Sequence, residues 1–295
     1  MNLKEVLSKS TLFLRQKQID SARLDSEILI ASALGWRRID LYLKSEYPLT
    51  DSELCRCRDH IARRGRGEPA AYILGEKEFY GHLFKVSNVV LVPRPETEHL
   101  VDEVISFAKA RPGPMRVVDL GVGSGCIGIS IIKSLPDAQL LGLDISKQAI
   151  DCARLNATNL EVADRCQFLV ADACGELSLS SSREFAQAVD VVVANPPYIA
   201  KGDTQVQPSV HDFEPHSALY SPEDGLYHIR QWVNLASKLL RVGGLLVMEF
   251  GFNQTKTVQE FIASGRGFGK SEIIKDYSGR DRVVRAIRQK EAANG

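Results

Sequence analysis

Residues 116 to 129 read RVVDLGVGSGCIGI, an apolar run that ends in Asp119, then three glycines, then the start of a helical pattern. The apolar run is typical of a strand buried on both faces of a parallel sheet. Glycine lets a backbone approach a ligand closely, and a helix N-terminus offers free N–H groups and a partial positive charge. The stretch therefore predicts a strand, loop and helix that hold a nucleotide-like cofactor. Gly123, Gly125 and Gly128 also satisfy the dinucleotide fingerprint G-x-G-x-x-G, which leaves a nicotinamide cofactor open at this point.

Two further apolar runs end in or near aspartates. Asp144 closes the run QLLGLD, and Asp172 follows the strand-like run from Gln167 to Val170. A carboxylate at the first of these positions suits both hydroxyls of a ribose. Each aspartate alone has a plain alternative as a helix N-cap or a loop residue. Three such strand ends in successive units favour one ligand site, because ligands of open α/β sheets bind at the carboxyl ends of the strands.

A fourth apolar run, VDVVVA (189 to 194), leads directly into Asn195-Pro196-Pro197-Tyr198. Proline has no N–H and a fixed φ, so the strand must stop and the backbone that follows has little freedom. Asn195 supplies a neutral oxygen acceptor, Pro196 a free carbonyl and Tyr198 a flat apolar face. The group suits a planar ligand that carries an NH₂. The alternative is an ordinary Asn-Pro turn at the end of a core strand.

This series of motifs resembles the S-adenosylmethionine-dependent methyltransferases with a Rossmann-like seven-stranded fold, in their amino-methylating branch, and it weakens the nicotinamide interpretation. Flanking segments resemble one family of that branch, the PrmC/HemK family. These segments are EPAAYILGEKEFYG (68 to 81), VLVPRPETE (90 to 98), Glu214-Pro215 with Ala218-Leu219 and Asp224-Gly225-Leu226, MEFG (248 to 251) and GRDRVV (279 to 284).

The resemblance implies an enzyme that transfers a methyl group from S-adenosylmethionine, leaving S-adenosylhomocysteine. The acceptor would be the side-chain amide of the glutamine in the Gly-Gly-Gln tripeptide of class I peptide-chain release factors. Its implied cofactor residues are Gly121, Val122, Gly123, Ser124, Gly125, Asp144, Asp172, Ala173 and Asn195. Asn195, Pro196, Pro197 and Tyr198 would bind the glutamine, with Asn195, Pro196 and Tyr198 in the catalytic role. The chain departs from the family pattern at Ala173, where many members have Trp, and at Val122, where threonine is common.

The chain divides into three expected parts. Residues 1–74 carry capping-box patterns at Asn2 and Thr50 and helical spacing of apolar residues, which predicts a small bundle of four or five helices. Residues 75–95 predict a connecting β-hairpin, and residues 96–290 the methyltransferase domain. The helical part is expected to dock the release factor. Its basic run RCRDHIARRGR (56 to 66) is either a face for an acidic or RNA-associated partner or a solvated helix surface. The biased tract SLSSS (178 to 182) is typical of a loop.

Composition favours a cytoplasmic protein. No apolar run reaches the length that a membrane span requires, and the N-terminus lacks a signal-peptide pattern. The six cysteines include no C-x-x-C pair, so neither a metal site nor a disulfide is expected. A formal net charge of zero argues against stable nucleic-acid binding. Two alternatives stay open, an amino-methyltransferase acting on adenine or guanine in nucleic acid and a cofactor-binding interaction protein without turnover.

Overall fold

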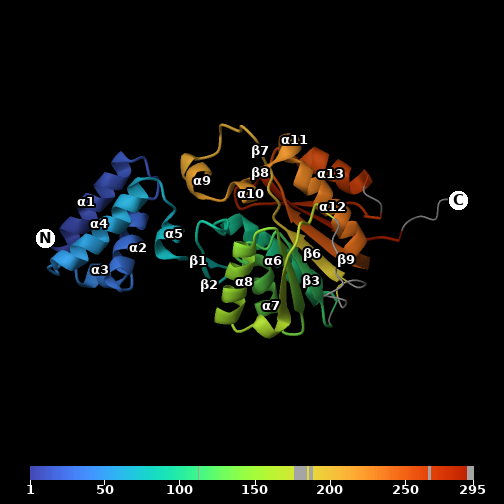
Figure 1. Ribbon diagram of the computed structural model, residues 1–295, viewed down its shortest axis with the longest axis horizontal. Coiled ribbons are helices and arrows are strands. Elements are labelled where there is room, and N and C mark those ends of the chain that lie inside the picture. Colours follow the sequence, from blue (N-terminus) through green and yellow to red (C-terminus); the bar gives the residue numbers. More distant parts are fainter. Residues whose placement is uncertain (112, 176–184, 186–188, 265–266, 291–295) are drawn as a thin grey trace. The chain divides into compact units, whose positions relative to one another are not determined.

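The computed structural model describes residues 1–111, 113–175, 185, 189–264 and 267–290. The expected loop at 178–182 lies outside them. The chain folds into two compact units (Figure 1). The first comprises Met1–Lys77 together with Gln205–Glu214, and the second comprises Glu78–Thr204 and Pro215–Gly295.

The first unit is helical, as predicted for the N-terminal part. Its helices are α1 (Leu3–Gln16), α2 (Ala22–Leu34), α3 (Asp40–Leu43), α4 (Asp51–Gly65), α5 (Ala70–Leu74) and α9 (Pro208–Phe213). Apolar stripes of α1, α2 and α4 bury one another, with Leu3, Leu14 and Leu29 fully inaccessible. The Thr50 capping box forms, because the Thr50 side chain accepts from Glu53 N and the Glu53 carboxylate accepts from Thr50 N.

Part of the basic run in α4 is neutralised within this unit. Arg64 Nε lies 2.6 Å from Asp25 Oδ2, and both side chains are largely buried. Arg63 forms a two-fold contact with Glu68, with nitrogen–oxygen distances of 2.9 and 2.5 Å. The Arg64–Asp25 pair therefore links α4 to α2, and the Arg63–Glu68 pair fixes the segment that follows α4. Arg56, Arg58 and Arg66 of the run are exposed, and Arg56 Nε donates to Ala33 O at 2.8 Å.

A hairpin of β1 (Glu76–Phe79) and β2 (His82–Lys85) follows the helices, as expected. Phe79 and Phe84 meet edge to face with ring centroids 6.2 Å apart, and both are buried. They belong to the core of the second unit, so the pair stabilises the hairpin against that core.

The second unit is built on a sheet to which seven strands contribute among the described residues. Its order is β10-β11-β9-β6-β3-β4-β5. Neighbours from β9 to β5 are parallel, whereas β11 is antiparallel to both β9 and β10. The strands are β3 (Arg116–Leu120), β4 (Gln139–Asp144), β5 (Cys166–Val170), β6 (Val189–Ala194), β9 (Leu240–Glu249), β10 (Glu272–Lys275) and β11 (Asp281–Ile287). A separate short ladder joins β7 (Ile199–Ala200) to β8 (Tyr220–Ser221).

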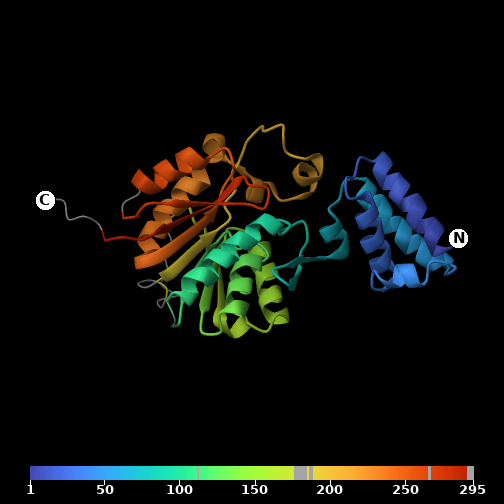
Figure 2. The ribbon, with the colours of Figure 1, turned by 180° about the vertical axis from the view of Figure 1, so that it is seen from behind.

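Helices cover both faces of this sheet (Figures 1 and 2). Alternate strand residues point to opposite faces, so Val117 packs with α6, α7 and α8 while Val118 packs with α12 and α13. The remaining elements are η1 (Pro95–Thr97), α6 (Glu98–Lys109), α7 (Cys126–Ser134), α8 (Lys147–Asn159), η2 (Ala163–Arg165), α10 (His216–Leu219), α11 (Pro222–Gly225), α12 (Tyr227–Leu239) and α13 (Thr255–Ser264). This three-layer arrangement confirms the predicted Rossmann-like fold.

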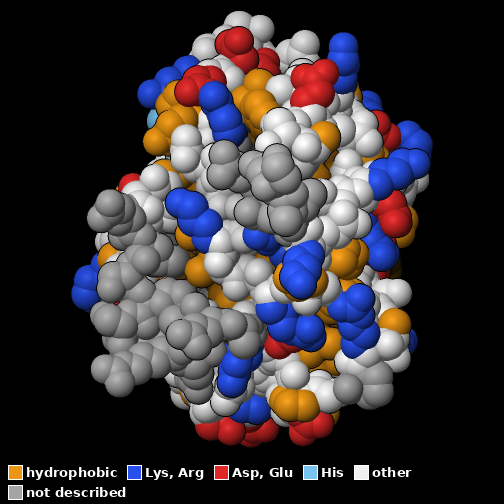
Figure 3. All heavy atoms as spheres, turned by 90° about the vertical axis from the view of Figure 1, so that its right-hand side faces the viewer, with side chains coloured by type: hydrophobic (Ala, Val, Ile, Leu, Met, Phe, Trp, Pro, Cys, Tyr) orange, Lys and Arg blue, Asp and Glu red, His pale blue; other side chains and the backbone are white. Residues whose placement is uncertain are grey.

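The surface mixes charges of both signs. On the face in Figure 3, basic side chains gather below the centre and acidic side chains lie at the upper and lower edges. Within the described residues, no helix has both the length and the apolar character that crossing a membrane requires. Among the same residues, no group of three or more His, Cys, Asp or Glu side chains is arranged to hold a metal ion.

One carboxyl in the central strand is buried at a cost. Asp119 is fully inaccessible on β3; its Oδ2 accepts from Gly128 N at 3.0 Å, while Oδ1 has no partner among the described residues. Burial raises the pKa of Asp119 to about 7, and the nearby charge of Asp144 adds to that rise against the opposing hydrogen bond from Gly128. A pKa raised on folding means that the charged form destabilises the fold above that pKa, and that this cost vanishes as the pH falls toward the unfolded-state pKa.

We therefore expect Asp119→Asn to raise the free energy of unfolding at pH 8 by up to about 4 kcal/mol, with the gain shrinking between pH 7 and pH 4. Asp190→Asn is the matched control on β6, because Asp190 pairs with Arg241 Nε at 2.5 Å and accepts from Arg116 N at 2.8 Å. That variant should lose stability at pH 8. Urea unfolding at several pH values measures both, and an Asp119→Asn protein no more stable than wild type at pH 8 would refute the assigned cost.

Candidate active site

A cleft lies at the carboxyl edge of the parallel strands, where the sheet order reverses between β3 and β6. The space between its walls is about 1020 Å³, a volume that includes open solvent. Most of the predicted site residues line it, from four different strand ends. They are Gly121, Val122, Gly123, Ser124, Asp144, Asp172, Ala173, Asn195 and Pro197, whereas Gly125, Pro196 and Tyr198 are not among the lining residues.

The glycine loop after β3 is fixed by its neighbours. Gly121 N and Val122 N both donate to Leu143 O on β4, at 2.8 and 2.9 Å. Gly125 has a φ of 82° at the N-terminus of α7, and a Cβ there would lie 2.6 Å from Ile129 Cδ1. Glycine is therefore favoured at 125 by the turn and by helix packing, a role that is independent of the cleft.

Asp144 ends β4 beside this loop. Its Oδ2 accepts from Gly123 N at 3.0 Å and its Oδ1 from Ser146 N at 2.9 Å. Burial raises the pKa of the carboxyl, and these backbone hydrogen bonds oppose the rise. A carboxylate oxygen has two lone pairs, so each oxygen keeps one for a further donor. The geometry suits paired hydroxyls.

The wall near Asp172 contains the two predicted residues Asp172 and Ala173 together with side chains from α12. Asp172 Oδ1 accepts from Cys174 N at 2.7 Å, and the small side chain of Ala173 is buried. Trp232 and His228, one turn apart on α12, line the same cleft, with their rings edge to face at 6.2 Å. Burial lowers the pKa of His228, which favours its neutral form. Ala173 stands where many family members have Trp, but an aromatic ring still lines the cleft, because Trp232 of α12 supplies it.

The backbone of the Asn195 segment is held rigidly. Pro196 and Pro197 are buried directly after β6. Gln254 Nε2 donates to Tyr198 O at 3.0 Å, and Gly251 N donates to Gln254 Oε1 at 3.0 Å. A Cβ at Gly225 would lie 2.2 Å from Tyr198 O, so only glycine permits this close approach of α11. The Asn195 side chain is thereby presented from a fixed backbone.

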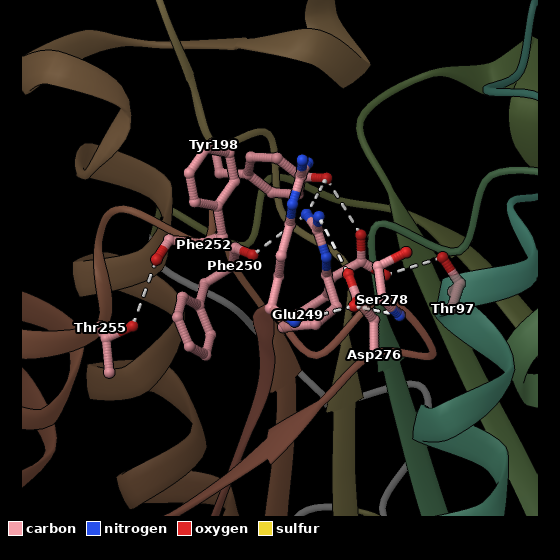
Figure 4. A network of polar contacts seen from close by, with 10 residues as sticks. Thr97, Tyr198, Glu249, Phe250, Phe252, Thr255, Asp276 and Ser278 are labelled. Atoms are coloured by element: carbon pink, nitrogen blue, oxygen red, sulfur yellow. Dashed lines mark hydrogen bonds and ion pairs between the residues drawn. The ribbon is translucent and has the colours of Figure 1, made fainter.

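A buried network joins Thr97, Tyr198 and Glu249 next to the Asn195 segment. Glu249, 2% exposed at the end of β9, accepts from Thr97 Oγ1 at 2.7 Å and from the Tyr198 hydroxyl at 3.0 Å (Figure 4). Arg282 Nη1 donates to the Tyr198 hydroxyl at 3.3 Å, and Asn195 Nδ2 to Thr97 Oγ1 at 3.4 Å. Burial raises the Tyr198 pKa far above its ordinary value, so the hydroxyl stays protonated. Tyr198 therefore anchors the segment from behind.

Sequence reasoning assigned no role to Thr97, Glu249, Arg282, His228 or Trp232. The first three lie in the stretches PRPETE, MEFG and GRDRVV, which supported the family resemblance as patterns only. A signal for Glu249 existed, because it closes the apolar run LLVM (245–248) as Asp144 closes LLGL (140–143). Trp232 carries no local signal, since an aromatic residue on an apolar helix stripe is also what a core requires.

Comparisons with known proteins agree with this geometry. A family model described as the PrmC N-terminal domain matches residues 5–75, and one described as the methyltransferase small domain matches residues 104–218. A solved structure, the hMettl16 catalytic domain in complex with MAT2A 3'UTR hairpin 6, is similar with a TM-score of 0.57 and 14% identity over 76% of this chain and 82% of that one. At that identity the likeness concerns the fold alone.

Two curated relatives match almost end to end. The release factor glutamine methyltransferase of Rhodopirellula baltica is 38% identical over 284 residues, which cover 95% of this chain and 94% of that protein. The release factor glutamine methyltransferase of Leptospira interrogans is 40% identical over 284 residues, with 95% and 96% covered. Identity at this level over nearly the whole length of both chains shows the family. This chain belongs to the release factor glutamine methyltransferases.

Proposed function

We propose that the protein transfers a methyl group from S-adenosylmethionine to the side-chain amide nitrogen of the glutamine in the Gly-Gly-Gln tripeptide of class I release factors. One observation carries the proposal. The rigidly held Asn195 amide lines the same cleft as the glycine loop and Asp144, so a neutral acceptor for an NH₂ group and a site for a nucleoside lie together.

The chemistry of the cleft lining supports S-adenosylmethionine as the cofactor. A Cβ at Gly123 would meet no atom closer than 3.9 Å, so the backbone there is open to a close ligand. Asp144 would accept from the ribose hydroxyls with its remaining lone pairs, and the wall of Ala173, Trp232 and His228 would receive the adenine. When bound, S-adenosylmethionine supplies an electrophilic methyl carbon on a positively charged sulfur.

The residues around Asn195 suit an amide nucleophile. An amide nitrogen is a poor nucleophile because its lone pair is delocalised into the carbonyl. Asn195 Oδ1 and the Pro196 carbonyl would accept from its two N–H groups, hold the nitrogen and favour electron density on it. Positioning at about 3 to 3.5 Å from the methyl carbon then supplies much of the rate.

Neutral acceptors are better here than a carboxylate. The positive charge on sulfur is consumed as the methyl group is transferred, so a nearby anion would stabilise the ground state more than the transition state. Glu249, a buried carboxylate of this region, is not one of the residues that line the cleft. Its two oxygens accept from the hydroxyls of Thr97 and Tyr198, and the positive charge of Arg282 lies close by.

We also propose that the helical unit docks the release factor away from the glutamine. The match of residues 5–75 to the PrmC N-terminal domain supports a dedicated role for residues 1–74 beside the hairpin of 75–95 and the methyltransferase domain of 96–290. Arg58 and Arg66 are exposed and are the better candidates for such a contact. Arg63 and Arg64 form ion pairs within the helical unit.

The function is tested by incubating the protein with radiolabelled S-adenosylmethionine and, in parallel, a class I release factor, the same factor with its Gly-Gly-Gln glutamine changed to alanine, and duplex DNA. We expect label on the intact factor alone. Label on DNA would favour the nucleic-acid alternative, and label on no substrate despite cofactor binding would favour a binding protein without turnover.

Asn195→Ala removes one of the two acceptors that hold the amide. We expect kcat to fall about 10²-fold or more, on the scale of losing one preorganised polar group, with cofactor affinity nearly unchanged. Asn234→Ala, at an exposed position on α12, is the matched control and should keep full activity. An Asn195→Ala enzyme with the wild-type turnover rate would rule out the assigned role.

Asp144→Ala removes the carboxylate expected to bind the ribose. The affinity for S-adenosylmethionine should weaken by roughly 1.5 to 3 kcal/mol in calorimetry, as for a lost hydrogen bond to a charged group. Asp144→Asn should keep part of the affinity. Asp151→Ala on α8 is the control, because that side chain is exposed and pairs with Lys147 at the surface. Equal affinity of Asp144→Ala and wild type would place the ribose elsewhere.

A further inference from the structure

The orientation of the Asn195 side chain depends on the direction of a hydrogen-bond chain. Thr97 Oγ1 lies 2.7 Å from Glu249 Oε2 and 3.4 Å from Asn195 Nδ2. A hydroxyl has one proton to donate and two lone pairs with which to accept. Because an ionised Glu249 accepts only, the Thr97 proton must go to it, and Thr97 turns lone pairs toward Asn195. Asn195 must then offer its NH₂ group to Thr97.

This constraint decides which atom of Asn195 is left for a ligand. An Asn side chain carries a donor NH₂ on one side and an acceptor oxygen on the other. With the NH₂ committed to Thr97, the oxygen is the atom that remains. The opposite orientation would leave an NH₂ facing the cleft, where it repels another NH₂. Correct orientation is therefore a functional requirement, although the two orientations have nearly the same shape.

The other oxygen of Glu249 is committed as well. The Tyr198 hydroxyl accepts from Arg282 Nη1 at 3.3 Å and donates to Glu249 Oε1 at 3.0 Å. A proton added to Glu249 would therefore sit on Oε2 and be donated to Thr97. Thr97 would in turn donate to Asn195, and the amide would reverse. The charge state of Glu249 thus sets the direction of the whole chain.

The strand register brings these groups together. Ala194 of β6 pairs with Met248 of β9, so Asn195 and Glu249 are the next residues on two neighbouring parallel strands. Val283 of β11 pairs with Glu249, which places Arg282 beside it. Burial raises the pKa of Glu249, while the hydrogen bond from Thr97, the charge of Arg282 and the hydrogen bond from Tyr198 lower it. Burial prevails, so the pKa is raised on balance. The hydrogen-bond geometry is nevertheless that of an ionised carboxylate, because hydroxyls point at both of its oxygens and Arg282 lies beside it.

We propose that ionised Glu249 is a positioning residue that acts through Thr97 to keep the Asn195 oxygen, rather than its NH₂, directed at the substrate. The inference rests on the proposed function, because it requires a substrate NH₂ group at Asn195. Glu249 itself touches neither substrate nor cofactor in this role.

Glu249→Gln tests the direction of the chain while keeping the shape of the side chain. Tyr198 still needs an acceptor, so the Gln oxygen faces Tyr198 and the Gln NH₂ faces Thr97. Thr97 then donates to Asn195 and holds the amide reversed. We expect kcat to fall about 10- to 100-fold, the equivalent of one unmade buried hydrogen bond, with the KM for the release factor and the affinity for S-adenosylmethionine nearly unchanged.

Thr97→Val removes the hydroxyl that transmits the constraint. Asn195 is then free to adopt either orientation, so kcat should fall only about three- to tenfold. The double variant Glu249→Gln/Thr97→Val should be as active as Thr97→Val alone, and hence more active than Glu249→Gln. Thr97→Ser keeps the hydroxyl and should recover most of the activity that Thr97→Val loses.

If Glu249 has a purely structural role, the kcat of the double variant should be no higher than that of Glu249→Gln. That result would overturn the proposal. If Glu249→Gln fails to bind S-adenosylmethionine in calorimetry, the comparison of Thr97→Val with Thr97→Ser decides alone, and equal rates overturn it. Thr255→Val is the matched control, because the hydroxyl that it removes contacts Asp281 Oδ2 at 2.9 Å and Phe252 O at 3.4 Å, and neither group bonds Glu249, Thr97 or Asn195. It should leave kcat unchanged.

Failure of the proposed function gives a different result. Wild-type protein that transfers no label to the release factor removes the substrate on which the inference depends. An active wild-type enzyme whose Glu249→Gln form is not rescued by Thr97→Val refutes the inference alone.

Discussion

The buried carboxylate of Glu249 is the constraint on which the site depends. It is 2% exposed, and it is held by hydroxyls from two distant segments, Thr97 before α6 and Tyr198 after β6. Burying a charge is costly unless it is hydrogen-bonded on every side. Here the hydrogen bonds that compensate the charge also fix the segment that carries Asn195. Stability of the network and orientation of the acceptor are consequences of the same contacts.

The sheet topology explains why two ligands meet in one cleft. The strand order runs outward from β3 to β5 at the edge of the sheet, and the next strand, β6, pairs with β3 on its other side. The glycine loop after β3 and the Asn195 segment after β6 therefore lie at adjacent strand ends. One half of the cleft offers a carboxylate and open backbone, which suit a nucleoside, and the other offers a neutral amide, which suits an NH₂. Asp119 and Glu249 lie beneath the two halves, and burial raises the pKa of both carboxyls. Such costs are typical of functional sites.

Much of the fold and half of the site follow from local sequence. Asp144 and Asn195 were predicted because each closes an apolar run, and the strand ends of a parallel sheet converge. The role of Glu249 could not be predicted in this way, because its partner Thr97 is 152 residues away in the sequence and no local pattern encodes that contact. The prediction that Tyr198 presents its ring to the ligand stays untested, but its hydroxyl is tied to Glu249 and its ring does not line the cleft. Trp232 lines the cleft together with Ala173 because α12 packs against the sheet. That packing joins segments far apart in the sequence, so local sequence does not predict it either.

Neutron diffraction from crystals of the deuterated protein addresses the orientation of Asn195 most directly, because it locates hydrogen positions that X-ray structures leave to inference. We expect no deuteron on Glu249, the Thr97 deuteron directed at Glu249 Oε2, and the Asn195 amide nitrogen facing Thr97. A deuteron on Glu249 Oε2, together with the Asn195 oxygen facing Thr97, would contradict the assignment of Glu249 as the residue that sets the acceptor toward the substrate.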